Sequence, residues 1–100
     1  MSGGTRIMTG SVTGTGSAIN VRTIGFRPKT VKLINTGGLV KAEWISPMPD
    51  AAAFKTLNHD TAQGAYITSD GITPLSNGFT IGADSDINAS GEAIFYVAEE

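Results

Sequence analysis

Three oxygen-bearing side chains stand at alternate positions near the end of the chain and could bind a cation. Asp84, Asp86 and Asn88 match the first, third and fifth places of an EF-hand calcium loop. Such a loop also needs Gly at its sixth place and Glu at its twelfth, where this chain has Ala89 and Phe95. The segment therefore favours a polar turn whose Asp and Asn side chains bond their own backbone. We expect no metal site, and a weak, irregular calcium site is the alternative.

Residue types that support catalysis are sparse elsewhere. His59 is the single histidine, no cysteine is present, and no Gly-x-Ser-x-Gly segment surrounds a serine. The nine carboxylates lie almost entirely in turn-like segments, and a 100-residue chain has little depth for a cleft. We therefore expect His59 to be an exposed loop residue, and we expect no catalytic residue, no cofactor and no enzymatic activity.

Charge is divided unevenly along the chain. Residues 1–41 carry six bases and no acid, whereas residues 42–100 carry Lys55 as the only base against nine carboxylates. Such a division predicts either a charged contact surface or, if strands from both halves interleave, a mixed surface. The pI near 5.2 argues against nucleic acid as the partner. The bases that cluster most closely in sequence are Arg22, Arg27, Lys29 and Lys32.

Short alternating segments separated by turn residues predict the elements that would position these groups. Their number and spacing predict an all-β fold: a small antiparallel β-sandwich or barrel, jelly-roll-like, of seven or eight short strands. The turn dipeptides Asp70-Gly71 and Asn77-Gly78 predict a loop over 70–78, and the Gly-rich segment after Asn35 predicts a hairpin. The expected strands are 17–24, 30–35, 39–46, 51–58, 65–69, 79–83 and 92–98.

The two ends of the chain carry further signals. Residues 1–16 are rich in Gly, Ser and Thr, and we expect a flexible N-terminal arm there, with an edge strand as the alternative, ahead of a β-sandwich domain over 17–100. The segment has no apolar run of the kind found in secretory signals, and no run is long enough for a membrane helix. The last strand carries apolar groups on both faces, which predicts an oligomer or another covering partner.

Four segments within about residues 17–98 resemble small structural proteins of tailed bacteriophages, namely the head decoration (cement) proteins and related virion β-domains. They are GFRPKTVKLIN, AEWISPMPD, SDGITPL and NGFTIGADSDINASGEAIFYVA. The resemblance implies a protein made in the host cytoplasm that binds the exterior of the assembled capsid. It also implies the major capsid protein and further copies of the chain, as a homotrimer, as partners, with no nucleic acid and no membrane. The bridged coat subunits would be stabilised by many weak contacts.

The resemblance implies no catalytic motif, so the candidate functional residues are contact residues. The alternative is a tail or fibre domain that binds a host-surface glycan, in which Trp44 and Tyr66 could stack on sugars, although a single Trp in an alternating strand is more often a core residue. The candidate capsid contacts are Thr5, Arg6, Ile7 and Met8 in the arm and Arg22, Arg27, Lys29 and Lys32 beyond it. The candidate core or oligomer-interface residues are Trp44, Phe79, Phe95 and Tyr96.

Overall fold

The computed structural model describes residues 6–58 and 62–100, which form one antiparallel sheet. The strand order across it is β1-β8-β3-β4-β5-β6-β7-β2, and the chain contains no helix, within the described residues, that could span a membrane. The predicted all-β fold of seven or eight strands is confirmed, although its eight strands share a single sheet rather than two stacked ones. The strands are β1 (Ile7–Thr13), β2 (Ile19–Val21), β3 (Thr30–Asn35), β4 (Val40–Ile45), β5 (Ala52–Asn58), β6 (Ala62–Leu75), β7 (Gly78–Ile81) and β8 (Ala93–Glu99).

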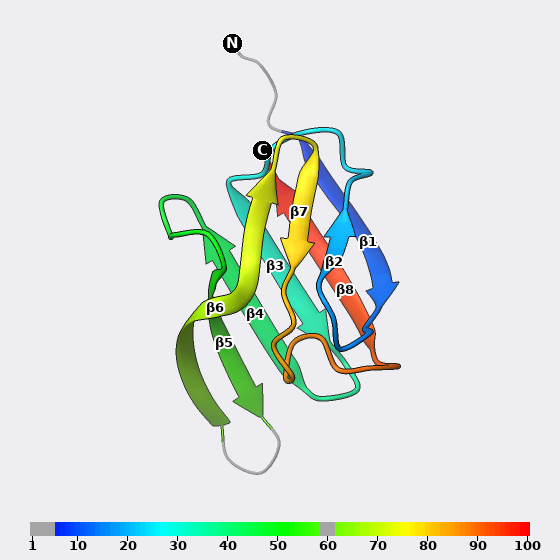
Figure 1. Cartoon of the computed structure of the whole chain (residues 1–100), viewed down its shortest axis with the longest axis vertical. Coiled ribbons are helices and arrows are strands. Elements are labelled where there is room, and N and C mark those ends of the chain that lie inside the picture. The colour runs from blue at the N-terminus through cyan, green and yellow to red at the C-terminus, as the bar shows by residue number, and fades with distance from the viewer. Residues whose placement is uncertain (1–5, 59–61) are drawn as a thin grey trace.

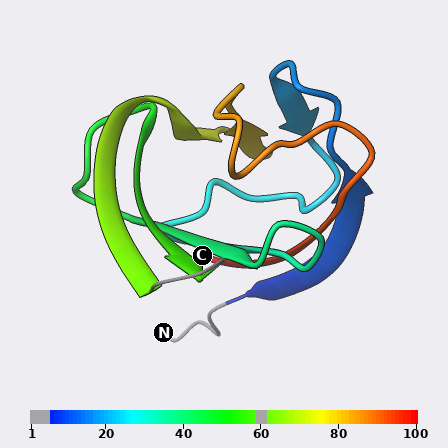
Figure 2. The same ribbon diagram turned by 90° about the horizontal axis from the view of Figure 1, so that it is seen from below.

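The sheet curls strongly into a half-barrel with a concave and a convex side (Figures 1 and 2). The connection 22–29, in cyan, and the connection 82–92, in orange, both run across the concave side (Figure 2). Ile24 and Phe26 from the first connection and Ile87 from the second are buried there. The concave side is therefore filled by the chain itself, and we call the convex side the outer face.

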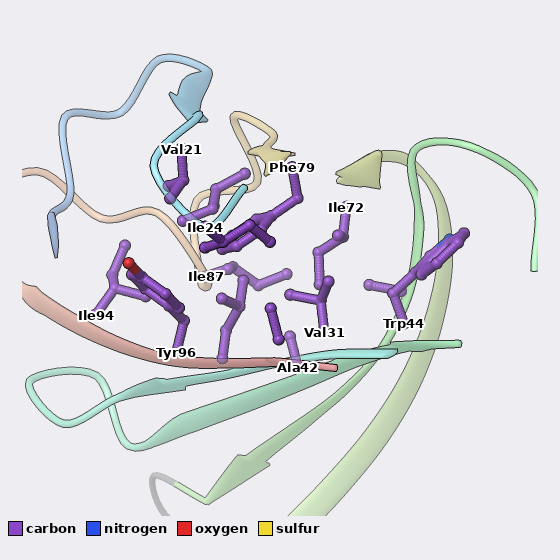
Figure 3. Close-up of a cluster of buried hydrophobic side chains, with 14 of the residues drawn as sticks. Val21, Ile24, Val31, Ala42, Trp44, Ile72, Phe79, Ile87, Ile94 and Tyr96 are labelled. Carbon is purple, nitrogen blue, oxygen red and sulfur yellow. The ribbon is translucent and has the colours of Figure 1, made fainter. Parts of the chain in front are cut away.

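Regular alternation in β3 and β4 separates the two sides of the sheet. Val31 and Leu33 on β3 and Ala42 and Trp44 on β4 are buried, and the residues between them are exposed. The strands predicted over 30–35 and 39–46 and the hairpin that joins them are confirmed. Figure 3 shows Val31 and Ala42 beside Ile72 and Ile87, which come from a distant strand and a connection, with Trp44 at the edge of the cluster. Because the buried side chains come from strands and connections along the whole curl, the core is complete only when the sheet closes around it.

One predicted loop is wrong. Residues 70–75, expected to be loop, continue the long strand β6, which bends sharply within its length (Figure 1). Ala53 lies opposite Ile67 and Ala52 lies opposite Ile72, so the residues between them form a large bulge in the ladder. The dipeptide at 70–71 does break local regularity, since Asp70 has a φ of 60°. It bends the strand across the curl instead of reversing the chain, because long-range pairing with β5 and β7 continues beyond it.

Two further expectations need correction at the start of the chain. Residues 7–13 form the edge strand β1, paired along its whole length with β8, so the edge-strand alternative is confirmed for them and the free-arm interpretation does not hold. The strand expected over 17–24 is only three residues long, because the chain leaves the sheet after Val21 and turns inward. The extended interpretation of 51–58 is confirmed by β5.

Candidate functional site

The outer face carries a group of large apolar side chains that are about half exposed. On it, Ile34 lies between Phe95 of β8 and Lys41 of β4, and Phe54 lies opposite Tyr66. Phe95 and Ile34 are 46% and 45% exposed. Apolar side chains gathered on one face, away from the core, are typical of a protein-binding surface. We call this set the outer patch; it comprises Ile34, Leu39, Ile45, Phe54, Tyr66 and Phe95.

Charged side chains are interspersed among the apolar ones. Lys32 and Glu43 are directly opposite each other on β3 and β4, and Lys41 occupies the neighbouring position toward the hairpin. All three are exposed. Cross-strand neighbours of opposite charge keep such a face soluble while leaving its apolar groups accessible. The outer face is thus a mixed surface suited to contact another protein.

A shallow pocket lies on the outer face beside the β3–β4 hairpin. Its volume is about 390 Å³, and Ile34, Leu39, Lys41 and Thr56 are among the residues that line it. Leu39 has a φ of 57° and is exposed, in a left-handed conformation that residues with a large side chain seldom adopt. The hairpin therefore holds an apolar side chain outward at the rim of the pocket.

The four predicted packing residues divide into two groups. Trp44, Phe79 and Tyr96 are buried core residues, whereas Phe95 belongs to the outer patch. The Phe79 and Tyr96 rings meet edge to face with centroids 5.3 Å apart (Figure 3). The Trp44 indole N–H donates to the Pro49 carbonyl at 3.0 Å. Trp44 is almost fully buried, which confirms the core interpretation over the alternative of stacking on sugars, and Tyr66 is the exposed aromatic of that pair.

The predicted basic contacts lie on two parts of the surface. Arg22, Arg27 and Lys29 are exposed on the connection 22–29, at the end of the half-barrel that also holds the C-terminus (Figure 1). Arg27 donates to the Pro74 carbonyl at 3.4 Å. Lys32 lies apart from them on the outer face. The structure thus does not gather these bases into one site.

The arm residues predicted as contacts are mostly tied to the domain. Arg6 forms a two-pronged ion pair with Glu100, at 2.6 and 3.0 Å, and its guanidinium lies 5.2 Å from the centre of the Phe26 ring. The hydrogen bond to Glu100 raises the pKa of Arg6, and the same bond lowers the pKa of Glu100. Ile7 and Met8 are exposed on β1. Thr5, like His59, lies outside the described residues.

The segment 82–92, first considered as a calcium loop, is held by a lysine of the same chain. The Lys55 ammonium donates to both Asp84 oxygens, at 2.9 and 3.0 Å, and to Asp86 at 2.7 Å. Asp84 also accepts from the backbone N–H groups of Asp86 and Ile87, each at 3.1 Å, which confirms the predicted turn. In the described part of the chain no group of three or more His, Asp or Glu side chains is placed to hold a metal ion. The cation at these carboxylates is the ammonium itself.

Lys55 is the residue that sequence reasoning missed. It points to the concave side of β5 and is 8% exposed. Burial lowers the pKa of Lys55, but its hydrogen bonds to Asp86 and Asp84 outweigh burial and raise the pKa above its ordinary value. Its position as the only base among the carboxylates of residues 42–100 was the available signal.

Two asparagines complete the attachment of this segment. Asn88 is fully buried; its amide donates to the Ser17 and Gly82 carbonyls at 2.6 and 2.9 Å, and its oxygen accepts from the Thr15 N–H at 2.9 Å. The Asn35 amide donates to Glu92 at 2.9 Å. Lys55, the two aspartates and the two asparagines therefore hold the connection 82–92 in place rather than forming an open site. We call this set of residues the polar constellation.

Comparison with protein-family models, with curated proteins and with solved structures gives no match to this chain. The fold and the surface together define a class only: a small all-β domain whose concave side is filled and whose convex side presents an exposed apolar patch.

Proposed function

We propose that this chain is a structural protein of a tailed-bacteriophage virion that binds the outer surface of the assembled capsid and stabilises it by bridging coat subunits. One observation carries the proposal: the outer patch is exposed because the described connections 22–29 and 82–92 run on the other side of the sheet. A surface of this kind favours an interaction protein over one whose function lies in a pocket. The sequence resemblance supplies the class of partner.

The mechanism follows from mass action. A protein that binds only the assembled shell stabilises that shell by the free energy of its own binding. The outer patch supplies apolar contacts, and Lys32 and Lys41 beside it can pair with coat acids. Arg22, Arg27 and Lys29, at one end of the half-barrel, provide a second group of contacts to a neighbouring coat subunit. Two contact regions on one rigid domain raise the effective concentration of each contact at the other.

Quantitative mass spectrometry of purified particles, with heads and tails separated, tests the proposal. We expect the chain in heads at a copy number comparable to that of the coat protein. Absence from heads, or a few copies confined to tails, would refute the capsid assignment, and the second result would favour the glycan-binding alternative.

Binding to purified heads that lack the protein tests the surface. We expect Phe95→Ser to weaken co-sedimentation with such heads at least about tenfold, because it removes a central apolar contact. Ala83→Ser, at an exposed position on the opposite side of the sheet, serves as the control and should bind like the original chain. Equal binding by both variants would exclude the outer patch as the contact surface.

A further inference from the structure

The edge strand β1 has a row of backbone groups that point away from the sheet. The bonds from Gly14 N–H to Glu92 and from Glu100 N–H to Arg6, at 2.8 and 2.9 Å, bracket the ladder between β1 and β8. Because antiparallel pairs alternate, the even-numbered residues of β1 direct their N–H and C=O groups toward β8. The odd-numbered residues direct theirs outward, and these residues are Ile7, Thr9, Ser11 and Thr13.

This edge lacks the features that usually keep two sheets apart. Over its seven residues β1 contains no charged residue and no proline, and each of its residues is exposed or half-exposed. Natural edge strands are typically short, charged or interrupted by proline, because a long unprotected edge pairs with other chains. The opposite edge of the sheet, β2, is only three residues long and is followed by Arg22. The edge suited to pairing is therefore β1.

We propose that two copies of this chain pair through β1, antiparallel, about a two-fold axis at Gly10. In this register Thr9 lies opposite Ser11 of the second copy and Ile7 lies opposite Thr13 of the second copy. Each of these pairs exchanges two backbone hydrogen bonds, and its symmetry mate exchanges two more, so every outward-pointing group of the strand is satisfied.

The side chains of β1 are self-complementary in this register. Gly10 meets Gly10 of the second copy at the axis, where the backbones approach most closely. Only glycine fits at this position within the domain, since a Cβ on Gly10 would overlap the Tyr96 ring. On the concave side Met8 lies opposite Val12 of the second copy, which covers a methionine that is 40% exposed.

The pairing would join the outer faces of the two copies into one surface. Ser11 lies beside Phe95 in the sheet, so the row that carries Ile34 and Phe95 continues across the axis into the second copy. A continuous surface of two outer patches would bind a repetitive partner through two linked contacts. The inference itself does not depend on the proposed function, because it concerns the purified chain alone.

Sedimentation velocity of the full chain over a range of concentrations tests the pairing. We expect a species with twice the 10.3 kDa mass of the chain. Ser11→Pro removes an outward N–H and places a ring on the free edge while leaving the β8 ladder intact, so the dissociation constant should rise at least about tenfold. Ser11→Ala, which changes the side chain but not the backbone donor, should dimerise like the original chain. Circular dichroism would verify that both variants fold.

Disulfide trapping tests the register. The chain has no cysteine, so single variants report without background. A mixture of Thr9→Cys and Ser11→Cys chains should form a disulfide-linked pair on mild oxidation, because directly opposite residues lie within disulfide range. Thr9→Cys alone should link poorly, because its own symmetry mate is a diagonal neighbour at about 7–8 Å.

Four outcomes of these experiments would overturn the proposal. A monomer at every concentration, a trimer in place of the dimer, or a dimer that Ser11→Pro leaves unchanged would show that β1 is not the pairing edge. Efficient linking of Thr9→Cys to itself would show that the axis does not lie at Gly10.

Discussion

Replacing Lys55 by methionine should destabilise the domain strongly. Methionine preserves most of the apolar stem that packs inside the half-barrel, so the substitution removes mainly the charge. The Lys55 side chain is 10% exposed, and its partners Asp84 and Asp86 are 13% and 34% exposed. Breaking a buried ion pair costs about 3–5 kcal/mol, because the remaining charge is left without a partner. Since water reaches Asp86, we expect a loss near the lower end, about 3 kcal/mol.

Urea unfolding followed by circular dichroism measures this loss of free energy of unfolding. In a thermal melt of the same variant, a loss of about 3 kcal/mol corresponds, for a domain of this size, to a fall of about 15 °C in the melting temperature. Lys41→Met is the matched control, because that lysine is exposed on the outer face, and it should change stability by less than about 0.5 kcal/mol.

A triple variant separates the loss of charge balance from the loss of packing. Lys55→Met combined with Asp84→Asn and Asp86→Asn removes the unpaired carboxylates together with the ammonium. We expect this variant to regain most of the lost stability, because no uncompensated charge then remains in the concave side. The reasoning is refuted if Lys55→Met alone unfolds within about 1 kcal/mol of the original chain, or if the triple variant is as unstable as the single one.

Three other predictions concern pH, packing and the surface. The pKa of Lys55 is raised by folding, so its contribution to the free energy of unfolding is fully present below the ordinary lysine pKa of about 10.4 and is lost as pH rises through the folded pKa. The difference in stability between the original chain and Lys55→Met should therefore shrink in urea titrations above that pH. A difference that stays constant with pH would contradict this prediction. Gly14→Ala should cost about 2 kcal/mol in the same assay, because the added Cβ would overlap the Ala89 carbonyl oxygen; an unchanged midpoint would disprove this contact. Phe95→Ser should cost about 1 kcal/mol or less in thermal melts, since the side chain is 46% exposed; a loss as large as that of Lys55→Met would place it in the core instead.

The elements that sequence analysis identified best are those whose two sides face different environments. In β3 and β4 every second residue is apolar and points into the core, so a period of two reveals both the strand and its buried face. The bend in β6 escaped detection because Asp70 and Gly71 are also typical of a hairpin turn. Gly71 instead lies so close to the Ala51 and Ala52 carbonyls that a side chain would not fit there. The chain continues as one strand because β6 pairs with β5 on both sides of the bulge, and no local sequence pattern encodes that pairing.

The segment 82–92 illustrates the same limit for a candidate site. Its spacing of oxygen-bearing residues was visible in the sequence, and so was its failure as a calcium loop. Lys55 is 29 residues from Asp84 in the sequence. They meet only because the connection 82–92 crosses the concave side of the sheet, the side toward which Lys55 points from β5. A cation site and an internal ion pair use the same residue types, so the sequence identified the carboxylates without identifying their partner.

The position of the polar constellation explains why the outer face is the surface left for function. Lys55, Asn35 and Asn88 fasten the connection 82–92 to the concave side, so this segment cannot swing over the convex side without breaking buried hydrogen bonds. Exposure of the outer patch is thus enforced by the same contacts that stabilise the fold. Loosening them, as in Lys55→Met, should expose the concave side without changing the composition of the outer face. Partner binding by the folded fraction of that variant should therefore persist, whereas Phe95→Ser should lose binding while remaining folded.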